Sequence, residues 1–415
     1  MFHTLYNIGL HLFGFILKIA AVFHAKARLW CDGRKGLLSD LQKWRSNNPG
    51  ELMWIHCASL GEFEQGRPLI EAMREEKPER MILLTFFSPS GYEIRKNYAH
   101  ANHVCYLPLD TPANAKRFLE IVRPSVVFFV KYEYWANYFF QCKKAEIPLY
   151  IISGILRQDQ RFFGLFKSFW KNVLACVAHF YVQNVSTAEL LRSIGFVNST
   201  VAGDTRFDRV LKLSTDAKHF EEFEKFVGSS FCVVGGSTWP QEEAMLATWF
   251  QRSIKTGKNY KLILVPHEIT PAHIHGLLAE FPEAECWTKR EGRSLSEAHV
   301  LIVDTIGMLA GIYQYGHVAV IGGGFGKGIH NTLEAAVWSR PVFFGPKHQK
   351  FEEAIELKGA GGGFSFSDGS ELSAYLDRCA TDTAFLNESG RKAGAFVKEN
   401  VGATKLIMSG LNAAR

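Results

Sequence analysis

The stretch LMWIHCASLGEFEQGRPLIEAMREEKPERMILLTFF, residues 52–87, predicts the fold at the start of the main body of this 415-residue chain. LMWIHC (52–57) and MILLTFF (81–87) are continuous apolar runs on either side of a charged, helix-like segment. Strands that are apolar at successive positions are typical of parallel sheets covered by helices on both faces. The stretch therefore predicts a strand-helix-strand unit of an α/β domain.

The same alternation continues along the chain and then restarts. Further strands are expected at 126–130, 148–153 and 180–184, and a second series at 231–236, 261–266, 300–304, 318–323 and 341–345. Two series predict two doubly wound parallel-sheet α/β domains, and the residues just after each strand are then candidates for ligand binding.

The expected domain limits follow from the two series. We predict an N-terminal domain over 35–210, a charged helical linker over 211–228 and a C-terminal domain over 229–415, whose last helix can pack back on the first domain. Residues 1–34 precede both domains.

This N-terminal segment combines an apolar run with basic residues. The run 5–23, LYNIGLHLFGFILKIAAVF, contains only three strongly polar residues, and residues 1–50 hold seven Lys or Arg against two Asp, a net charge of +5 in a chain total of +6. Basic residues beside an apolar helix indicate acidic lipid headgroups rather than nucleic acid. We therefore predict a helix in or on the inner leaflet of a membrane, with the rest of the chain cytoplasmic.

Two alternatives for this segment stay open. A signal peptide carries its positive charge before the apolar stretch, whereas here the charges follow it. A helix packed on the body of the protein has the same composition, and one helix can serve both a groove and a bilayer. The eight cysteines stand apart, without a CxxC pair, which indicates a reducing compartment and neither a structural metal nor a disulfide framework.

Three polar side chains are expected at one edge of the first sheet. Glu62 lies in the turn after the first strand, Glu133 follows VVFFV (126–130) beside Lys131, and Arg206 lies in VAGDTRFD after a further strand. An accessible carboxylate in such a turn can act as a general base. Alternatively, Glu62 only complements the dipole of the helix that follows.

Two strands of the second series are followed by segments that can bind an anion. In VVGGSTWPQEE, Ser237 and Thr238 are expected at the start of a helix, and a glycine-rich loop over 322–328 precedes a helix that begins near Asn331. Helix amino ends bind phosphate, and glycines let the backbone approach a ligand. Glu334 can bind the two hydroxyls of a ribose, or else serve as the capping-box partner of Asn331.

Several nucleotide-binding patterns are missing from the sequence. It has no P-loop, no Rossmann fingerprint near the chain start and no D-x-D pair, which disfavours NAD and a metal-held nucleotide diphosphate. A leaving phosphate must then be stabilised by helix amino ends, hydroxyls and a cationic side chain.

Together these motifs resemble a known family. The ordered set WIHCASLGE, VKYEYWAN, YVQN, VAGDTRFD, GGSTWPQEE, LVPHE, VDTIGML and GIHNTLEAAVWSRPVFFGP is similar to the 3-deoxy-D-manno-octulosonic acid (Kdo) transferases of Gram-negative lipopolysaccharide synthesis. The resemblance covers nearly the whole chain. It implies a GT-B glycosyltransferase, with an acceptor-binding and a CMP-binding domain facing a central cleft.

The resemblance also implies a reaction and roles for single residues. Such enzymes move Kdo from CMP-Kdo to the glucosamine 6-hydroxyl of lipid A precursor at the cytoplasmic face of the inner membrane, with inversion and without metal or other cofactor. Glu62 matches the family's base, and Glu133 and Arg206 match its transition-state stabilisers. His267 stands where the family usually has Arg. The residues expected at the CMP moiety are Ser237, Thr238, Pro266, His267, Ile306, Gly307, Met308, Asn331, Thr332, Leu333 and Glu334.

Three other functions share parts of this pattern. A membrane-associated GT-B enzyme that uses a UDP-sugar has the same fold, and so does a nucleotide-sugar epimerase, which has no use for the apolar N-terminus. A protein that binds lipid A or sugar without catalysis needs neither Glu62 nor a nucleotide-binding half.

Overall fold

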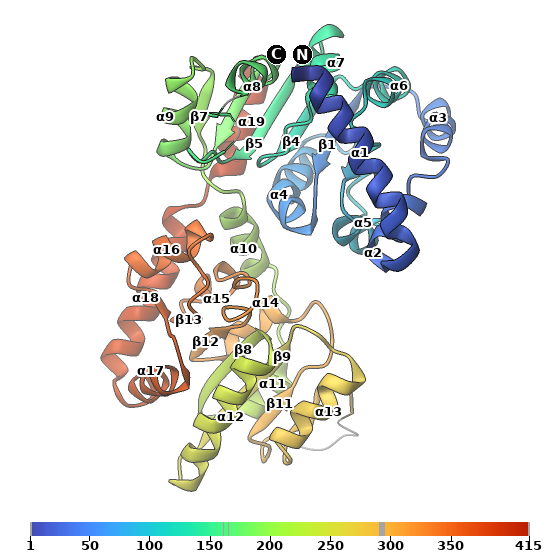
Figure 1. Cartoon of the computed structure of the whole chain (residues 1–415). Coiled ribbons are helices and arrows are strands. Elements are labelled where there is room, and N and C mark those ends of the chain that lie inside the picture. Colours follow the sequence, from blue (N-terminus) through green and yellow to red (C-terminus); the bar gives the residue numbers. More distant parts are fainter. Residues whose placement is uncertain (1, 161, 165, 290–294, 414–415) are drawn as a thin grey trace. The chain divides into compact units, whose positions relative to one another are not determined.

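The computed structural model describes residues 2–160, 162–164, 166–289 and 295–413, which divide into two compact units (Figure 1). Unit 1 comprises residues 1–209 and 402–415, and unit 2 comprises residues 210–401. We describe each unit by itself. The cleft expected between the two domains stays a prediction.

Unit 1 is built on a parallel sheet whose described strands are seven, in the order β3-β2-β1-β4-β5-β6-β7. The strands are β1 (Leu52–Cys57), β2 (Met81–Phe86), β3 (His103–Tyr106), β4 (Val126–Val130), β5 (Leu149–Gly154), β6 (His179–Val182) and β7 (Ser199–Val201). The strand order reverses between β1 and β4, which is the point where doubly wound sheets bind ligands at their carboxyl ends.

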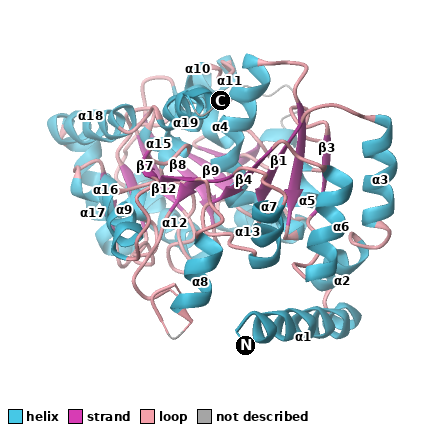
Figure 2. Cartoon of the chain, turned by 90° about the horizontal axis from the view of Figure 1, so that it is seen from above, coloured by secondary structure: helices cyan, strands magenta, loops and turns pink. Residues whose placement is uncertain are grey.

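Helices cover both faces of this sheet, so all six residues of β1 are buried (Figure 2). The helices of unit 1 are α1 (Phe2–Phe23), α2 (Ala25–Asp32), α3 (Leu37–Asn47), α4 (Leu60–Glu76), α5 (Pro89–Arg95), α6 (Pro112–Val122), α7 (Ala136–Lys144), α8 (Lys167–Leu174), α9 (Val185–Ser193) and α19 (Ala403–Ala413). The last helix, α19, packs on α4 through Ile407, and Asp208 accepts hydrogen bonds from the backbone of Gly402 and Thr404.

Unit 2 repeats the architecture with the strand order β10-β11-β9-β8-β12-β13-β14. Its described strands are β8 (Phe231–Thr238), β9 (Tyr260–Pro266), β10 (Glu285–Cys286), β11 (Val300–Ile302), β12 (Val318–Ile321), β13 (Val342–Phe344) and β14 (Gly363–Ser365). The order reverses between β8 and β12, and every strand pair is parallel.

The helices of unit 2 follow its strands in the usual alternation. They are α11 (Glu221–Val227), α12 (Pro240–Lys255), α13 (Pro271–Glu280), α14 (Leu309–Ile312), α15 (Leu333–Ala336), α16 (Glu352–Gly359), α17 (Gly369–Thr381) and α18 (Thr383–Glu399), with 3-10 turns at Trp287–Lys289 and Tyr313–Tyr315. The helix α10 (Arg206–Thr215) begins in unit 1 and ends in unit 2.

Residues 211–228, predicted as a linker, are part of unit 2. The ring of Phe223 in α11 is fully buried and stacks on Trp287 and Tyr315, with centroid distances of 4.6 and 5.3 Å. Although α11 is rich in charged residues, it therefore has an apolar face, which is packed inside unit 2.

All ten strands predicted from the sequence are present, and two doubly wound parallel-sheet units are confirmed. The sequence reasoning missed β3, β7, β10 and β14, which are short strands towards or at the sheet edges. Edge strands lack the continuous apolar pattern of central strands because one side of them faces no neighbour. One position was also wrong: Ser237 and Thr238 end β8, and the helix begins at Pro240.

The apolar N-terminal helix is confirmed as α1, which is long and apolar enough to cross a membrane by length and composition. One face of α1 contacts unit 1: Tyr6 donates to Asp110 (2.6 Å), Asn7 accepts from Asn137 (2.8 Å) and the ring of Phe13 stacks on Phe87. The opposite face is exposed and consists of Leu5, Ile8, Leu12, Ile16, Ile19 and Phe23. The helix α1 thus lies at the surface of unit 1 (Figure 2), and the exposed residues form an apolar stripe on its outer face.

Candidate functional site

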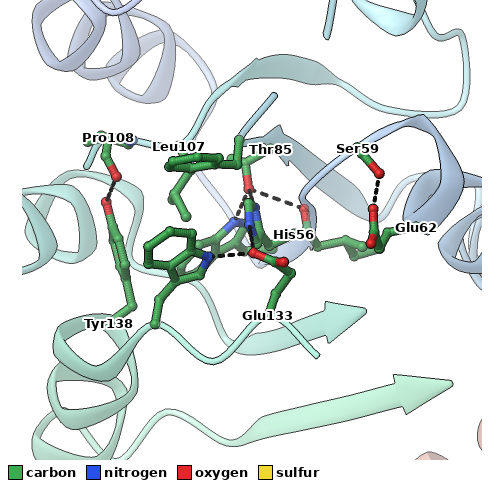
Figure 3. Close-up of polar contacts among 12 residues, drawn as sticks. His56, Ser59, Glu62, Thr85, Leu107, Pro108, Glu133 and Tyr138 are labelled. Atoms are coloured by element: carbon green, nitrogen blue, oxygen red, sulfur yellow. Dashed lines mark hydrogen bonds and ion pairs between the residues drawn. The ribbon is translucent and has the colours of Figure 1, made fainter. Parts of the chain in front are cut away.

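Glu62 lies in the first turn of α4, after β1, and is half-buried. The hydroxyl of Ser59, at the N-cap position, donates to the Glu62 carboxylate (Figure 3). The carboxylate thus lies at the carboxyl end of β1 and is partly accessible, which is compatible with general base catalysis. The same position also complements the helix dipole, so both predicted interpretations fit the geometry.

Glu133 lies in the loop after β4, the strand beside β1 at the reversal of strand order. The indole Nε1 of Trp135 donates to Glu133 Oε2 at 2.8 Å, and His56 Nε2 lies 3.9 Å from the same oxygen. The Glu133 side chain is 17% exposed and is thus mostly surrounded by protein. The sequence predicted Glu62 and Glu133 at one sheet edge, and the structure places them there, just after the adjacent strands β1 and β4.

Arg206, the predicted cation, begins α10 and binds a carboxylate that the sequence reasoning did not identify. Its Nε and Nη2 donate to Asp204 Oδ2 at 2.9 and 2.6 Å, and its backbone N–H donates to Asp204 Oδ1 at 2.9 Å. Gln65 Nε2, from α4, donates to the same Oδ2 at 3.0 Å. Arg206 is thus fixed beside α4, and its charge is partly balanced by Asp204.

Asp204 is buried yet stays ionised. Burial by itself raises the pKa of its carboxyl, but the charges of Arg206 and Lys131 and the hydrogen bonds from Arg206 outweigh burial, so the pKa lies below its usual range. The ion pair therefore fixes two charges at this edge. An Asp two residues before an Arg, at the start of a helix, is the signal in the sequence from which this contact could have been expected.

In unit 2, three rings gather after β8, β9 and β12. Trp239 Nε1 donates to His330 Nε2 at 3.0 Å, their ring planes are 10° apart, and His267 stacks on both, with centroid distances of 4.8 Å to Trp239 and 4.3 Å to His330. Sequence reasoning missed Trp239 and His330. Since the indole N–H only donates, His330 Nε2 accepts and its ring is neutral.

The protonation of these rings bears on the predicted phosphate contact of His267. Burial, with the nearby His267, lowers the pKa of His330 to about 4. Burial also lowers the pKa of His267, against the opposing charge of Glu268. His267 is therefore neutral near pH 7 and offers a flat polar ring where an arginine would offer a permanent charge.

The residues predicted to contact CMP differ in what they expose. Thr238, Pro266, Thr332 and Leu333 are buried, and Ser237, Met308, Asn331 and Glu334 are half-buried, whereas His267, Ile306 and Gly307 are exposed. The buried residues among these can contact a ligand only through their backbone atoms. Thr238 Oγ1, in addition, already donates to Glu243 at 2.8 Å.

The start of α15 differs from the predicted capping box, because the N-cap position is Thr332 and Glu334 is bound by a side chain. Asn331 Oδ1 accepts from the backbone N–H of Leu333 at 3.0 Å, and Asn331 Nδ2 donates to Glu334 Oε1 at 3.0 Å. Asn331 thus orients the Glu334 carboxylate.

The glycine-rich loop serves internal packing at two of its positions. A Cβ at Gly322 would lie 2.1 Å from the carbonyl oxygen of Ser237, and one at Gly324 would lie 2.5 Å from the Cα of Gly345. These two glycines are therefore required by close packing of the backbone.

No group of three or more His, Cys, Asp or Glu side chains that could hold a metal ion occurs among the residues the structure describes.

Comparison with known proteins agrees with the motifs. A family model described as 3-deoxy-D-manno-octulosonic-acid transferase (kdotransferase) matches residues 32–209, the range that holds Glu62, Glu133 and Arg206. These residues are therefore similar to the Kdo transferase family. A Kdo transferase of Aquifex aeolicus is 29% identical over 327 residues, which are 78% of this chain and 84% of that protein.

Other relatives extend the resemblance beyond this domain. The Kdo transferase of Chlamydia trachomatis serovar A is 26% identical over 317 residues, covering 74% of this chain and 72% of that protein. The resemblance of the chain to Kdo transferases is thereby confirmed, and the relatives indicate a glycosyltransferase.

A solved structure shares the fold. The UDP-GlcNAc 2-epimerase of Neisseria meningitidis, in complex with UDP-GlcNAc, superimposes with a TM-score of 0.61 over 88% of this chain and 100% of that chain, at 13% identity. This likeness concerns architecture alone and agrees with the predicted GT-B class.

Proposed function

We propose that this protein transfers Kdo from CMP-Kdo to the glucosamine 6-hydroxyl of a lipid A precursor, with inversion and without a metal ion. The observation that carries the proposal is the match of residues 32–209, which contain the half-buried Glu62, to the Kdo transferase family. Its relatives over most of the chain bear the same name.

In the proposed step, the acceptor hydroxyl oxygen bonds to the anomeric carbon of Kdo from the face opposite the CMP phosphate. The bond between that carbon and the phosphate oxygen breaks, and its electron pair leaves with CMP. The hydroxyl proton passes to Glu62, which lies in the first turn of α4 at the carboxyl end of β1.

Glu133 and Arg206 have the proposed role of stabilising the charges of this transition state. Both side chains are held in place before substrate binds, Glu133 by Trp135 and Arg206 by Asp204. Groups that are already oriented stabilise a transition state without a reorganisation cost.

We assign the CMP moiety to the carboxyl edge of the second sheet. Asn331 and Glu334 present oriented polar atoms there, and the ring of His267 and the exposed Ile306 offer flat and apolar surfaces for a nucleoside. The Glu334 carboxylate is of the kind that accepts hydrogen bonds from ribose hydroxyls.

The protein is proposed to act at the cytoplasmic face of the inner membrane through α1. A 22-residue helix is long enough to span a bilayer, yet contacts from Tyr6 to Phe13 hold α1 against unit 1. We infer that α1 lies in the interface, with the stripe of Leu5, Ile8, Leu12, Ile16, Ile19 and Phe23 toward the acyl chains.

Nucleotide choice separates this function from its rivals. CMP at about 100 times its Kd should stabilise the protein by about 2.7 kcal/mol, and UDP at the same concentration should not. Stabilisation by UDP alone would favour a UDP-sugar transferase instead, and stabilisation by neither nucleotide would favour a lipid-binding or sugar-binding protein.

A further inference from the structure

A buried histidine lies behind Glu133. His56, near the end of β1, is fully buried, and its Nε2 has no hydrogen-bond partner within the part of the chain that the structure describes. Buried polar nitrogens are rarely unpaired, because loss of hydration without a hydrogen bond is costly. Glu133 Oε2 lies 3.9 Å from this nitrogen (Figure 3).

The other ring nitrogen defines which tautomer is present. His56 Nδ1 lies 2.9 Å from the hydroxyl of Thr85, and that hydroxyl accepts from Trp54 Nε1 at 2.8 Å. The Thr85 hydroxyl can donate its hydrogen bond to His56 Nδ1 or to the carbonyl oxygen of Ile55, which is farther away at 3.5 Å. Donation to Nδ1 makes that nitrogen the acceptor and leaves the ring proton on Nε2, facing the carboxylate.

The tautomer of His56 with its proton on Nδ1 is disfavoured by charge. It would direct the lone pair of Nε2 at the negative Oε2 of Glu133, with nothing in between to compensate. A doubly protonated ring is disfavoured as well, since burial, with the nearby charge of Arg34, lowers the pKa of His56 to about 3. The neutral Nε2–H form is thus the one that the surroundings of β1 and β2 select.

We propose that His56 is a positioning residue, which donates from Nε2 to the Glu133 carboxylate when substrate is bound. The present separation of 3.9 Å exceeds a hydrogen bond, and a shift of the carboxylate by about 1 Å closes it. Trp135 already donates to the same oxygen, so His56 would add a further donor to it. This inference rests on the proposed role of Glu133.

The test compares two amides at position 56. In His56→Gln the amide nitrogen reaches the place of Nε2, whereas in His56→Asn it reaches only the place of Nδ1. We expect His56→Gln to keep kcat for CMP-Kdo and acceptor lipid within about threefold, and His56→Asn to lower it at least tenfold, in the range for a hydrogen bond to a charged group. The KM for CMP-Kdo should be unchanged in both.

A matched control is available on β6. His179 Nε2 also lies 2.9 Å from a threonine hydroxyl, that of Thr200, but at the amino end of its strand. His179→Asn should keep the parent kcat. Equal loss of kcat in His56→Gln and His56→Asn, with equal loss of melting temperature, would reduce His56 to a packing residue.

A second measurement does not depend on turnover. Nitrogen-15 spectra of the full chain labelled at histidine, with the His56 signal assigned from the His56→Gln variant, report the tautomer directly. We expect a neutral ring protonated at Nε2, and Thr85→Val should mix the tautomers while the fold is kept. A ring protonated at Nδ1 in the parent overturns the inference even if Kdo transfer is confirmed, and an inactive parent with the expected tautomer refutes only the proposed function.

Discussion

The guanidinium of Arg206 binds the buried carboxylate of Asp204, two residues before it, with two donors to one oxygen at 2.9 and 2.6 Å. The side chains of Arg206 and Asp204 are only 18% and 8% exposed. A pair this far from solvent fixes the start of α10 and leaves a cation of defined position at the carboxyl edge of the first sheet.

Replacing Asp204 by Asn keeps the shape of this side chain and removes its charge. We expect the free energy of unfolding at pH 7 to fall by about 3 kcal/mol, the lower end for breaking a buried pair, because Arg206 is left without its counter-ion. Urea unfolding measures the change. Asp159→Asn is the control, since Asp159 is 81% exposed and its pair with Arg157 contributes little.

The Asp204 pair also predicts a dependence on pH. Since the folded pKa of Asp204 lies below its unfolded value of about 3.9, the pair stabilises the protein fully above that value and less as the pH falls toward the folded pKa. The difference in stability between the parent and Asp204→Asn should therefore be constant from pH 7 to about pH 5 and shrink below pH 4. If this difference in the free energy of unfolding stays constant down to pH 3, the charge of Asp204 is not its source.

Glu62 can be tested with two substitutions that separate its two possible roles. Glu62→Gln should lower kcat at least about 10²-fold, the range of general base catalysis, with CMP affinity unchanged. Glu62→Asp keeps the negative charge at the start of α4 but withdraws the carboxylate, so it should also lose activity while stability changes by less than about 1 kcal/mol. Full activity of Glu62→Asp would leave Glu62 as a helix-terminal charge only.

Glu334 is expected to bind the nucleotide. Glu334→Ala should weaken CMP binding about tenfold, because an oriented carboxylate that accepts hydrogen bonds is removed. Calorimetry with CMP measures the affinity. Glu371→Ala is a suitable control in the same unit, since Glu371 also lies in the first turn of a helix and its carboxylate accepts from the backbone N–H and hydroxyl of Ser367. Equal affinity in the parent and Glu334→Ala would make Glu334 a partner of Asn331 alone.

The outward stripe of α1 is expected to hold the protein on anionic vesicles. Ile8→Glu combined with Ile16→Glu should reduce binding to vesicles with acidic headgroups at least tenfold, since two side chains that are 58% and 52% exposed in the protein no longer enter the acyl region. Val197→Glu is the control, because Val197 is 80% exposed but lies outside α1. Vesicle co-sedimentation gives the partition, and unchanged binding in the double variant would assign the membrane contact to another surface.

Much of the fold could be predicted because its central strands are buried on both faces. LMWIHC and KLILVP are apolar at nearly every position, and their strands β1 and β9 are wholly buried. The edge strands β7 and β10 lack this pattern, and Ser237 and Thr238 were assigned to a helix because hydroxyl residues before Pro240 are typical of a helix start.

The candidate site was predictable only in part for a similar reason. Glu62 and Glu133 follow the two strands at the reversal of order, so their shared edge follows from topology. The contacts of Asp204 with Gln65, of His56 with Glu133 and of Trp239 with His330 join residues far apart in the chain. Such contacts depend on tertiary packing, which local spacing does not express.

Kdo transfer itself is tested most directly by mass spectrometry of the lipid product. The purified protein is incubated with CMP-Kdo and tetraacylated lipid A precursor, beside Glu62→Gln as the inactive partner. We predict that the parent adds one or more Kdo masses to the precursor and that the variant adds none at the same time point. A precursor of unchanged mass with the parent, under conditions where CMP binds, would contradict the account.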